Sequence, residues 1–239
     1  MSLKFNGSIR KFIAVDSGCF ILAGDRGVGK SSSLAIFAEV YKKMGYKVFC
    51  QYPYKGCYQI PMVKTNINGV TRSNVDKNWL YSANLSECCV LLDEAKNIWP
   101  ARGWSKWTQA DDDFFDFLRH THTVIVAATL AYDCLDLNVR RAADYSIFIT
   151  KEILQFSYWE VAHTTIAKVS DKNSEIIGRA GKQGMRKVNW EVVEVPIDSF
   201  HFWRKTYYNK YLTEHMIDEK PLPELNKWPS ELFPKGIIK

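Results

Sequence analysis

Gly24-Asp25-Arg26-Gly27-Val28-Gly29-Lys30-Ser31 is the stretch that decides the fold. It fits G-x-x-x-x-G-K-[ST], the pattern of a phosphate-binding loop. The apolar run 19–23 precedes it and is typical of a short buried strand, while 32–44 carries apolar residues at helical spacing. A strand, a glycine loop and a helix N-terminus would gather backbone N–H groups around one point, and such a point attracts phosphate.

Each part of this loop has a chemical role. The glycines allow backbone angles and close approaches that a side chain would block. We expect Lys30 to reach the β- and γ-phosphates of ATP and the Ser31 hydroxyl to coordinate Mg²⁺. The residues expected to bind the nucleotide are Gly24, Asp25, Arg26, Gly27, Val28, Gly29, Lys30, Ser31 and Ser32.

A second signal is the apolar run 88–92, which ends in Asp93 and Glu94. Such a run predicts a buried parallel strand that delivers carboxylates to the sheet edge where open α/β sheets bind ligands. Asp93 fits the acid that orients magnesium, directly or through water, and Glu94 fits the base that activates water. The pair favours hydrolysis over phosphoryl transfer to a small acceptor.

Several other residues are candidates with two interpretations each. Thr129 ends the predicted strand 124–129, where it would sense the γ-phosphate or serve only as a β-branched strand residue. An arginine could neutralise transition-state charge on a neighbouring subunit's nucleotide, although a surface salt bridge is the commoner fate of arginine. The arginine candidates are Arg119, Arg140 and Arg141.

A tryptophan-rich segment follows the acid pair. Trp99, Trp104 and Trp107 alternate with Arg102 and Lys106. Such a segment could stack on nucleobases or contact a neighbouring subunit. Alternatively, its aromatic side chains could simply pack against one another within a long loop.

The order of predicted elements sets the fold class. Strands at 47–51, 88–92, 124–129 and 145–149 alternate with helices that include 108–122, capped by Thr108 with Asp111 in a capping box. This alternation predicts an α/β, doubly wound, mainly parallel sheet, with residues 1–150 as the core. Hairpins are expected within residues 51–73. Residues 1–17 are expected to form a short segment that leads into the first strand.

We expect residues 151–239 to form a small C-terminal extension that contains strands and a helix and packs on the core. It would hold antiparallel strands at 156–169 and 188–195, a helix at 199–211 and an extended tail from Pro221. The glycine-rich basic loop 178–187 is a candidate DNA contact or a solvated surface loop. Its cations are Arg179, Lys182, Arg186 and Lys187.

Composition narrows the class of protein. The 239 residues are 46% hydrophobic, with a formal charge of +6 that permits a polyanionic partner without requiring one. The six cysteines form no C-x-x-C pair, so zinc and redox motifs are not indicated and a reduced compartment fits best. Neither a transmembrane segment nor a signal peptide is expected, so we expect the chain in the host-cell cytoplasm. It would associate with a virion or a membrane only through partner proteins.

Three stretches resemble the zonula occludens toxin-like ATPases of the FtsK–HerA superfamily. They are 90–102, with its Asp-Glu-Ala and Pro-x-Arg pieces, 118–129 and 135–140, and the resemblance covers roughly 20–151. It implies ATP, Mg²⁺, a ring of identical subunits that is usually a hexamer, and a nucleic-acid cargo, with viral capsid or assembly proteins as further partners. It also places Arg119 at the superfamily's arginine finger.

Two departures from that pattern matter. Many members carry a sensor glutamine after the threonine matched by Thr129, where this chain has Leu130. The membrane span that toxin-like phage proteins often carry does not follow the ATPase core in this sequence, which favours either a soluble packaging motor or a shortened form of a longer protein.

These signals lead to one main functional hypothesis. It is an ATP-hydrolysing motor that translocates viral or phage DNA in genome packaging or virion assembly and export. Its catalytic residues would be Lys30, Asp93, Glu94, Arg119 and Thr129, with Ser31 and Asp93 at the metal. The alternatives are a nucleotide-gated assembly scaffold with little turnover and, less favoured, a small-molecule kinase.

Overall fold

Six parallel strands form the centre of the molecule. The computed structural model describes residues 6–52, 54, 56–67, 70–102, 107–151, 156–169 and 189–204. Within these ranges one sheet has eight strands in the order β10-β9-β8-β1-β7-β6-β2-β3. The parallel strands are β1 (Gly18–Ala23), β2 (Lys47–Cys50), β3 (Tyr58–Gln59), β6 (Cys88–Leu92), β7 (Val124–Thr129) and β8 (Tyr145–Lys151).

The three central strands are continuous apolar runs because helices cover both of their faces. Every residue of β1, β6 and β7 is buried, as expected for a parallel sheet between two helical layers. β1 pairs with β7 in parallel register from Gly18 opposite Val124 to Ala23 opposite Thr129. The carboxyl ends of β1 and β7 therefore meet at one edge of the sheet.

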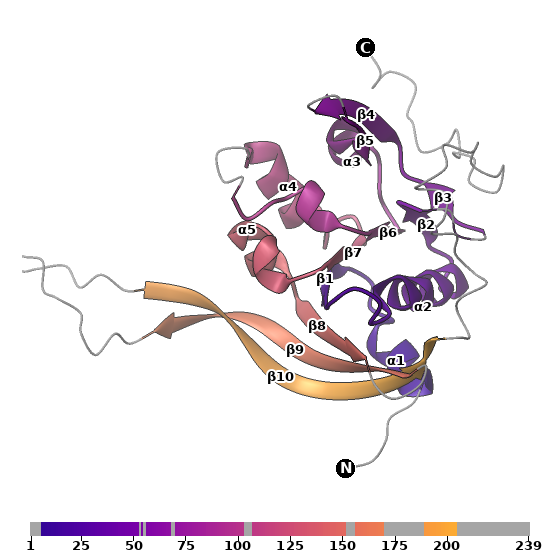
Figure 1. Ribbon diagram of the computed structural model, residues 1–239, viewed down its shortest axis with the longest axis vertical. Helices are drawn as coiled ribbons and strands as arrows, with labels where there is room; N and C mark the ends of the chain where they lie inside the picture. Colours follow the sequence, from indigo (N-terminus) through magenta and orange to yellow (C-terminus); the bar gives the residue numbers. More distant parts are fainter. Residues whose placement is uncertain are drawn as a thin grey trace, which may run out of the picture.

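The helices divide between the two faces (Figure 1). α1 (Asn6–Phe12) and α2 (Lys30–Lys43) pack on one side, where Phe20, Phe37 and Tyr41 lie in the core. α3 (Lys77–Ser82), α4 (Gln109–Phe117) and α5 (Leu137–Ala142) pack on the other. The predicted doubly wound α/β fold is confirmed.

Two helices differ from the prediction: α4 is shorter than expected, and α1 was not predicted. α4 ends at Phe117 rather than His122, because the chain turns there and His122 adopts a left-handed φ of 49°. α1 occupies part of the segment expected to be only a lead-in. Ile9 of this helix and Ile13, which directly follows it, are fully buried, which explains why this short helix forms.

The predicted hairpin region holds a small antiparallel ladder. β4 (Met62–Ile67) pairs with β5 (Val70–Val75) as a separate two-stranded sheet. This agrees with the hairpins expected within 51–73.

β9 (Phe156–Val169) and β10 (Asn189–Trp203) extend the main sheet from β8 as a long antiparallel ribbon (Figure 1). β9 matches the prediction, but the helix predicted from residue 199 is wrong as far as Trp203. Phe200 and Phe202 are buried while His201 and Trp203 are only partly so, which is the period of a strand. The pairing shifts register between Pro196 and Asp198.

Some predictions lie outside the described residues. They are the rest of that helix, the basic loop 178–187 and the tail from Pro221. The division into a core of 1–150 and an extension of 151–239 stays a prediction. None of the helices in the described ranges combines the length and the hydrophobicity that a membrane span requires. All six cysteines are free thiols.

Candidate nucleotide site

The loop between β1 and α2 has the backbone of a phosphate-binding loop. Gly27 and Gly29 have φ angles of 75° and 111°, which side chains rarely adopt. A Cβ on Gly24 would run into the carbonyl oxygen of Ile149 in β8. Val28 anchors the loop with a buried side chain, whereas Asp25, Arg26 and Gly27 are exposed. The loop thus ends at the N-terminus of a 14-residue helix, where backbone N–H groups favour an anion.

Lys30 folds back on this loop. Its Nζ donates hydrogen bonds to the carbonyl oxygens of Gly24 at 2.7 Å and Asp25 at 2.8 Å. Burial lowers the pKa of Lys30, while Asp93, Glu94 and Asp25 oppose that shift. A bound polyphosphate would act in the same sense as these acids and favour the charged lysine.

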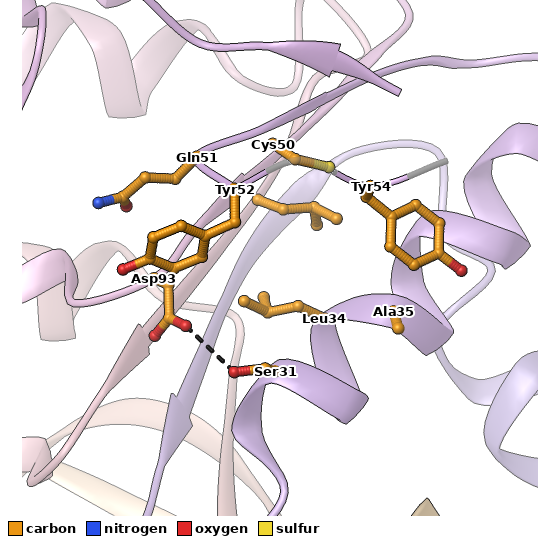
Figure 2. Close-up of a pocket in the computed structure, with 9 residues that line it drawn as sticks. Ser31, Leu34, Ala35, Cys50, Gln51, Tyr52, Tyr54 and Asp93 are labelled. Atoms are coloured by element: carbon orange, nitrogen blue, oxygen red, sulfur yellow. Dashed lines mark hydrogen bonds between the residues drawn. The ribbon is translucent and has the colours of Figure 1, made fainter. Parts of the chain in front are cut away.

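Asp93 and Ser31 come together as the sequence predicts. β6 ends beside β7, and the Ser31 hydroxyl donates to Asp93 Oδ2 at 3.3 Å (Figure 2). Asp93 is 8% exposed, and burial raises its pKa, while hydrogen bonds from the Glu94 N–H and from Ser31 lower it. A hydroxyl and a carboxylate at this separation are hard oxygen donors of the kind that Mg²⁺ prefers.

Glu94 points elsewhere because the backbone turns at this residue. Its φ and ψ of 54° and 41° are left-handed, and a 3-10 turn, Ala95–Asn97, follows at once. Glu94 Oε2 lies 3.1 Å from Lys96 Nζ, and the carboxylate is partly exposed. The two neighbouring acids therefore have different surroundings, as different roles require.

Thr129 reaches the same sheet edge as the loop. It pairs with Ala23, the last residue of β1, and is fully buried. Its Oγ1 donates to the Ala131 carbonyl at 3.2 Å. This position fits either interpretation of Thr129, and its sensor role stays a prediction.

Arg119 lies at the opposite edge of the sheet. It precedes the start of β7, and its Nη2 pairs with Asp144 Oδ1 at 3.1 Å just before β8 begins. Its side chain is 78% exposed. Within one chain, Arg119 is thus separated from Lys30 and Asp93 by the length of the strands. The other candidates lie on α5, where the Arg140 guanidinium packs over Tyr132 at 5.5 Å and Arg141 is exposed.

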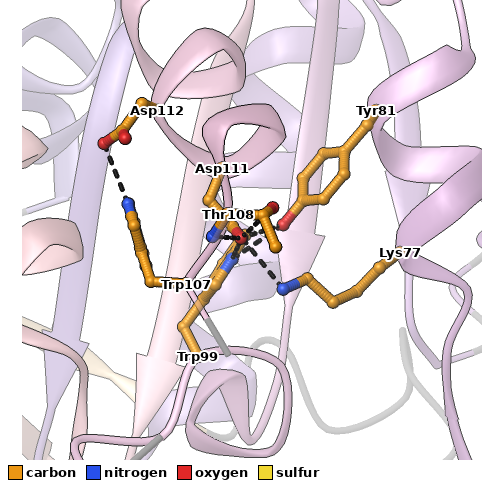
Figure 3. Close-up of polar contacts among 7 residues, drawn as sticks. All are labelled: Lys77, Tyr81, Trp99, Trp107, Thr108, Asp111 and Asp112. Carbon is orange, nitrogen blue, oxygen red and sulfur yellow. Dashed lines mark hydrogen bonds and ion pairs between the residues drawn. The ribbon is translucent and has the colours of Figure 1, made fainter. Parts of the chain in front are cut away.

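Of the described residues of the tryptophan segment, Trp99 is interior, whereas Arg102 is exposed. Trp99 is 2% exposed and donates to Asp111 Oδ1 at 2.9 Å (Figure 3). Trp107 stacks on Phe115 and donates to Asp112. Packing, rather than nucleobase stacking, is therefore the role of Trp99, and Trp104 lies outside the described residues.

Sequence reasoning missed Gln51 and Tyr52 at the carboxyl end of β2. With Ser31 and Asp93 they line a cavity of about 30 Å³ (Figure 2), which is room for about one water molecule. Gln51 is 7% exposed, and its Oε1 has no hydrogen-bond partner among the described residues. The signal was available, because residue 51 ends a predicted strand that pairs with the Asp93 strand.

Comparisons with known proteins bear on this fold. No protein-family model matches the sequence, and no curated protein matches it. The N-terminal domain of zonular occludens toxin from Neisseria meningitidis is structurally similar, with a TM-score of 0.50 at 16% identity. The match covers 82% of this chain and 99% of that domain.

Two weaker matches are viral proteins. The genome packaging NTPase B204 from Sulfolobus turreted icosahedral virus 2, in complex with ATP-gammaS, has a TM-score of 0.44 at 18% identity, over 58% of this chain and 76% of that one. B204, the DNA-packaging ATPase from Sulfolobus turreted icosahedral virus, has a TM-score of 0.41 at 19% identity, over 58% and 78%. The match to the toxin's N-terminal domain confirms the resemblance to zonula occludens toxin-like proteins at the level of the fold, and the chain shares the architecture of that domain.

Proposed function

We propose that this chain is an ATP-hydrolysing motor that moves viral or phage DNA as a ring of identical subunits. The observation that carries the proposal is the meeting of Ser31 and Asp93, 3.3 Å apart, beside a loop with the backbone of a phosphate site. Lys30, Glu94 and Thr129 lie at the same sheet edge.

The loop residues would bind the triphosphate. The N–H groups at the start of α2 would face the phosphate oxygens, and Lys30 would exchange its bonds to Gly24 and Asp25 for phosphate contacts. Ser31 and Asp93 would hold Mg²⁺, which neutralises charge on the phosphates when bound. Burial of Asp93 supports this role, because a buried carboxylate gains most from a cation.

Glu94 would accept the proton of the attacking water. It is separated from the Ser31–Asp93 pair by its backbone turn and is partly exposed, so its carboxylate can meet solvent. Thr129, buried at the end of β7, would stand near the γ-phosphate and report its loss.

The placement of Arg119 supports a ring. An exposed arginine at the far edge of its own sheet can reach only the nucleotide of a neighbouring subunit. DNA as cargo, and capsid or assembly proteins as partners, follow from the resemblance to the zonula occludens toxin-like ATPases. Packaging and virion assembly or export both fit this chemistry.

The test is ATP hydrolysis by the full chain with Mg²⁺, measured alone and with double- or single-stranded DNA. Particle mass is measured in parallel with ATP bound. K30A serves as the inactive control. We expect hydrolysis that DNA stimulates, in a particle several times the mass of one chain. Tight ATP binding with negligible turnover and no effect of DNA would replace the motor with an assembly scaffold, and phosphate transfer to a nucleoside would indicate a kinase.

A further inference from the structure

Side chains of the β9–β10 ribbon and of the residue that follows it form hydrogen bonds with the backbone of the phosphate-binding loop. Arg204, which directly follows β10, donates from Nη1 to the Gly27 carbonyl at 2.5 Å. Ser157 of β9 donates from Oγ to the Val28 carbonyl. These donors come from 177 and 129 residues further along the chain.

A third contact continues the series. The Gly29 carbonyl accepts the backbone N–H of Ser33 at 2.9 Å, as part of helix α2, and also accepts a hydrogen bond from Ser33 Oγ at 2.9 Å. Ser33 Oγ in turn accepts one from the indole Nε1 of Trp159 in β9 at 3.0 Å. Two consecutive loop carbonyls, those of Gly27 and Val28, are thus held by side chains of the ribbon, and the next one is held by α2 with a ribbon side chain bonded behind it.

The orientation of these carbonyls decides what the loop can bind. A peptide unit is planar, so a carbonyl held outward turns the N–H of the next residue inward. The ribbon bonds to Gly27 and Val28 therefore direct the N–H groups of Val28 and Gly29 toward the anion position, and the α2 bond to Gly29 does the same for the N–H of Lys30. Arg204 also places a positive charge behind the loop, which favours an anion in front of it.

The packing leaves the loop little freedom. Ser157 and Trp159 are fully buried, and Arg204 is 5% exposed. A Cβ added to Gly29 would lie 2.8 Å from both Arg204 Cδ and Ser157 Oγ. The ribbon and the loop are therefore in direct contact along the backbone.

We propose that Arg204 and Ser157 are positioning residues of the nucleotide site, through which the β9–β10 ribbon keeps the loop in its anion-binding shape. The proposal rests on the nucleotide-binding part of the proposed function and is independent of DNA and of the ring. It makes the C-terminal strands part of the site rather than an accessory to it.

The experiment compares R204Q, R204K and S157A in the full chain. The control is T164V, because Thr164 is also buried on β9 and its hydroxyl pairs with Ser146 at 3.0 Å, far along the strand from the loop. Binding of a fluorescent ATP analogue, turnover at saturating ATP, and hydrogen exchange at the amides of residues 28–30 are measured for each folded variant.

We expect R204Q to weaken analogue binding about tenfold, since a charge-assisted hydrogen bond is lost. R204K should recover part of that loss, S157A should show a smaller one, and T164V should bind like the original chain. Protection of the amides of residues 28–30 from hydrogen exchange should fall in the same order as analogue binding. Turnover at saturating ATP should change little. Should T164V weaken binding as much as R204Q, or should R204Q and S157A leave binding and protection unchanged, the proposal is overturned. If the unaltered chain does not bind the analogue, the proposed function fails instead.

Discussion

Asp93 and Glu94 show how neighbouring residues acquire separate chemistry. Asp93 is buried against Ser31 and accepts a bond from the next N–H, whereas Glu94 adopts a left-handed conformation and pairs with Lys96. One carboxylate is held for a cation and the other is left near solvent. The left-handed backbone at Glu94 is what separates them.

Glu94→Gln is predicted to separate binding from turnover. The amide keeps the size of the side chain but cannot accept the proton of water, so hydrolysis should fall by about 10³-fold. Nucleotide affinity should stay within a few-fold, because the Glu94 carboxylate pairs with Lys96 rather than with a loop residue. Steady-state hydrolysis and analogue binding check this, and turnover of E94Q at the original rate would remove Glu94 as the base.

Asp93→Asn is predicted to raise stability while it removes activity. Because burial raises the pKa of Asp93, its ionised form opposes folding, and that cost grows as the pH rises through the raised pKa. In EDTA at pH 7.5, D93N should unfold with a free energy about 1 kcal/mol higher than that of the original chain. The difference should shrink as the pH falls toward about 4, and denaturant unfolding at several pH values measures it. A D93N protein less stable at pH 7.5 would contradict this account.

The sequence predicts those candidate site residues that belong to one short stretch of chain. Lys30 and Ser31 follow from the spacing of one loop, and Asp93 and Glu94 from the end of one strand. Arg204 and Ser157 could not be found this way, because their contacts depend on how β9 and β10 pair with β8. Nothing in the letters near residue 204 indicates a loop 177 residues earlier.

At the scale of elements, one buried carboxylate links the N-terminus of α4 to its neighbours. Asp111 closes the predicted capping box with Thr108 and also accepts bonds from Trp99 and Tyr81, with Lys77 at 2.9 Å (Figure 3). Desolvation acts to raise the pKa of Asp111, but the bonds from Tyr81, Lys77 and Thr108 outweigh it, so the pKa is lowered. The capping box was predictable, whereas the contacts from α3 and from Trp99 required the tertiary structure.

Asp111→Ala is predicted to cost about 3 kcal/mol of folding free energy, since several buried donors lose their acceptor. Asp112→Ala is the matched control from the same helical turn, because Asp112 makes one exposed bond, to Trp107, and should cost under about 1 kcal/mol. The lowered pKa means that the contribution of Asp111 is present above about pH 4 and is lost as the pH falls further. Urea unfolding of both variants from pH 7 to pH 3 tests this, and equal costs would refute a special role for Asp111.

The error at residues 199–203 also belongs to this scale. The aromatic run Phe200-His201-Phe202-Trp203 fits a helix or a strand equally well over so few residues. Pairing with β9 decides the matter, since Phe200 lies opposite Trp159 and Phe202 opposite Ser157. Long-range pairing outweighs local preference here.

At the scale of the whole molecule, the sheet separates the candidate nucleotide site from the candidate arginine finger. The loop, Asp93 and Thr129 lie at the carboxyl ends of the parallel strands, and Arg119 with Asp144 lies at the amino ends. A ring would bring the amino edge of one subunit to the carboxyl edge of the next. The sequence alone did not reveal this separation.

Arg119→Ala is predicted to reduce hydrolysis by at least about 10³-fold while nucleotide binding is retained. R119A and K30A chains are each expected to be inactive, yet mixing them should restore measurable hydrolysis. A mixed ring places the intact loop of an R119A subunit beside the Arg119 of a K30A subunit. R141A, which removes the exposed arginine of α5, is the comparison, and full activity of R119A alone would exclude Arg119 as the finger.

The interruption in β10 has a consequence for how copies of this chain meet. β10 is the outermost strand of the described sheet, with Val195 and Ile197 46% and 49% exposed on either side of Pro196. Proline offers no backbone N–H, and the register shift beside it breaks the regular ladder. A strand from another molecule would meet an interrupted ladder at this point, which disfavours fibre-like addition where apolar side chains are displayed.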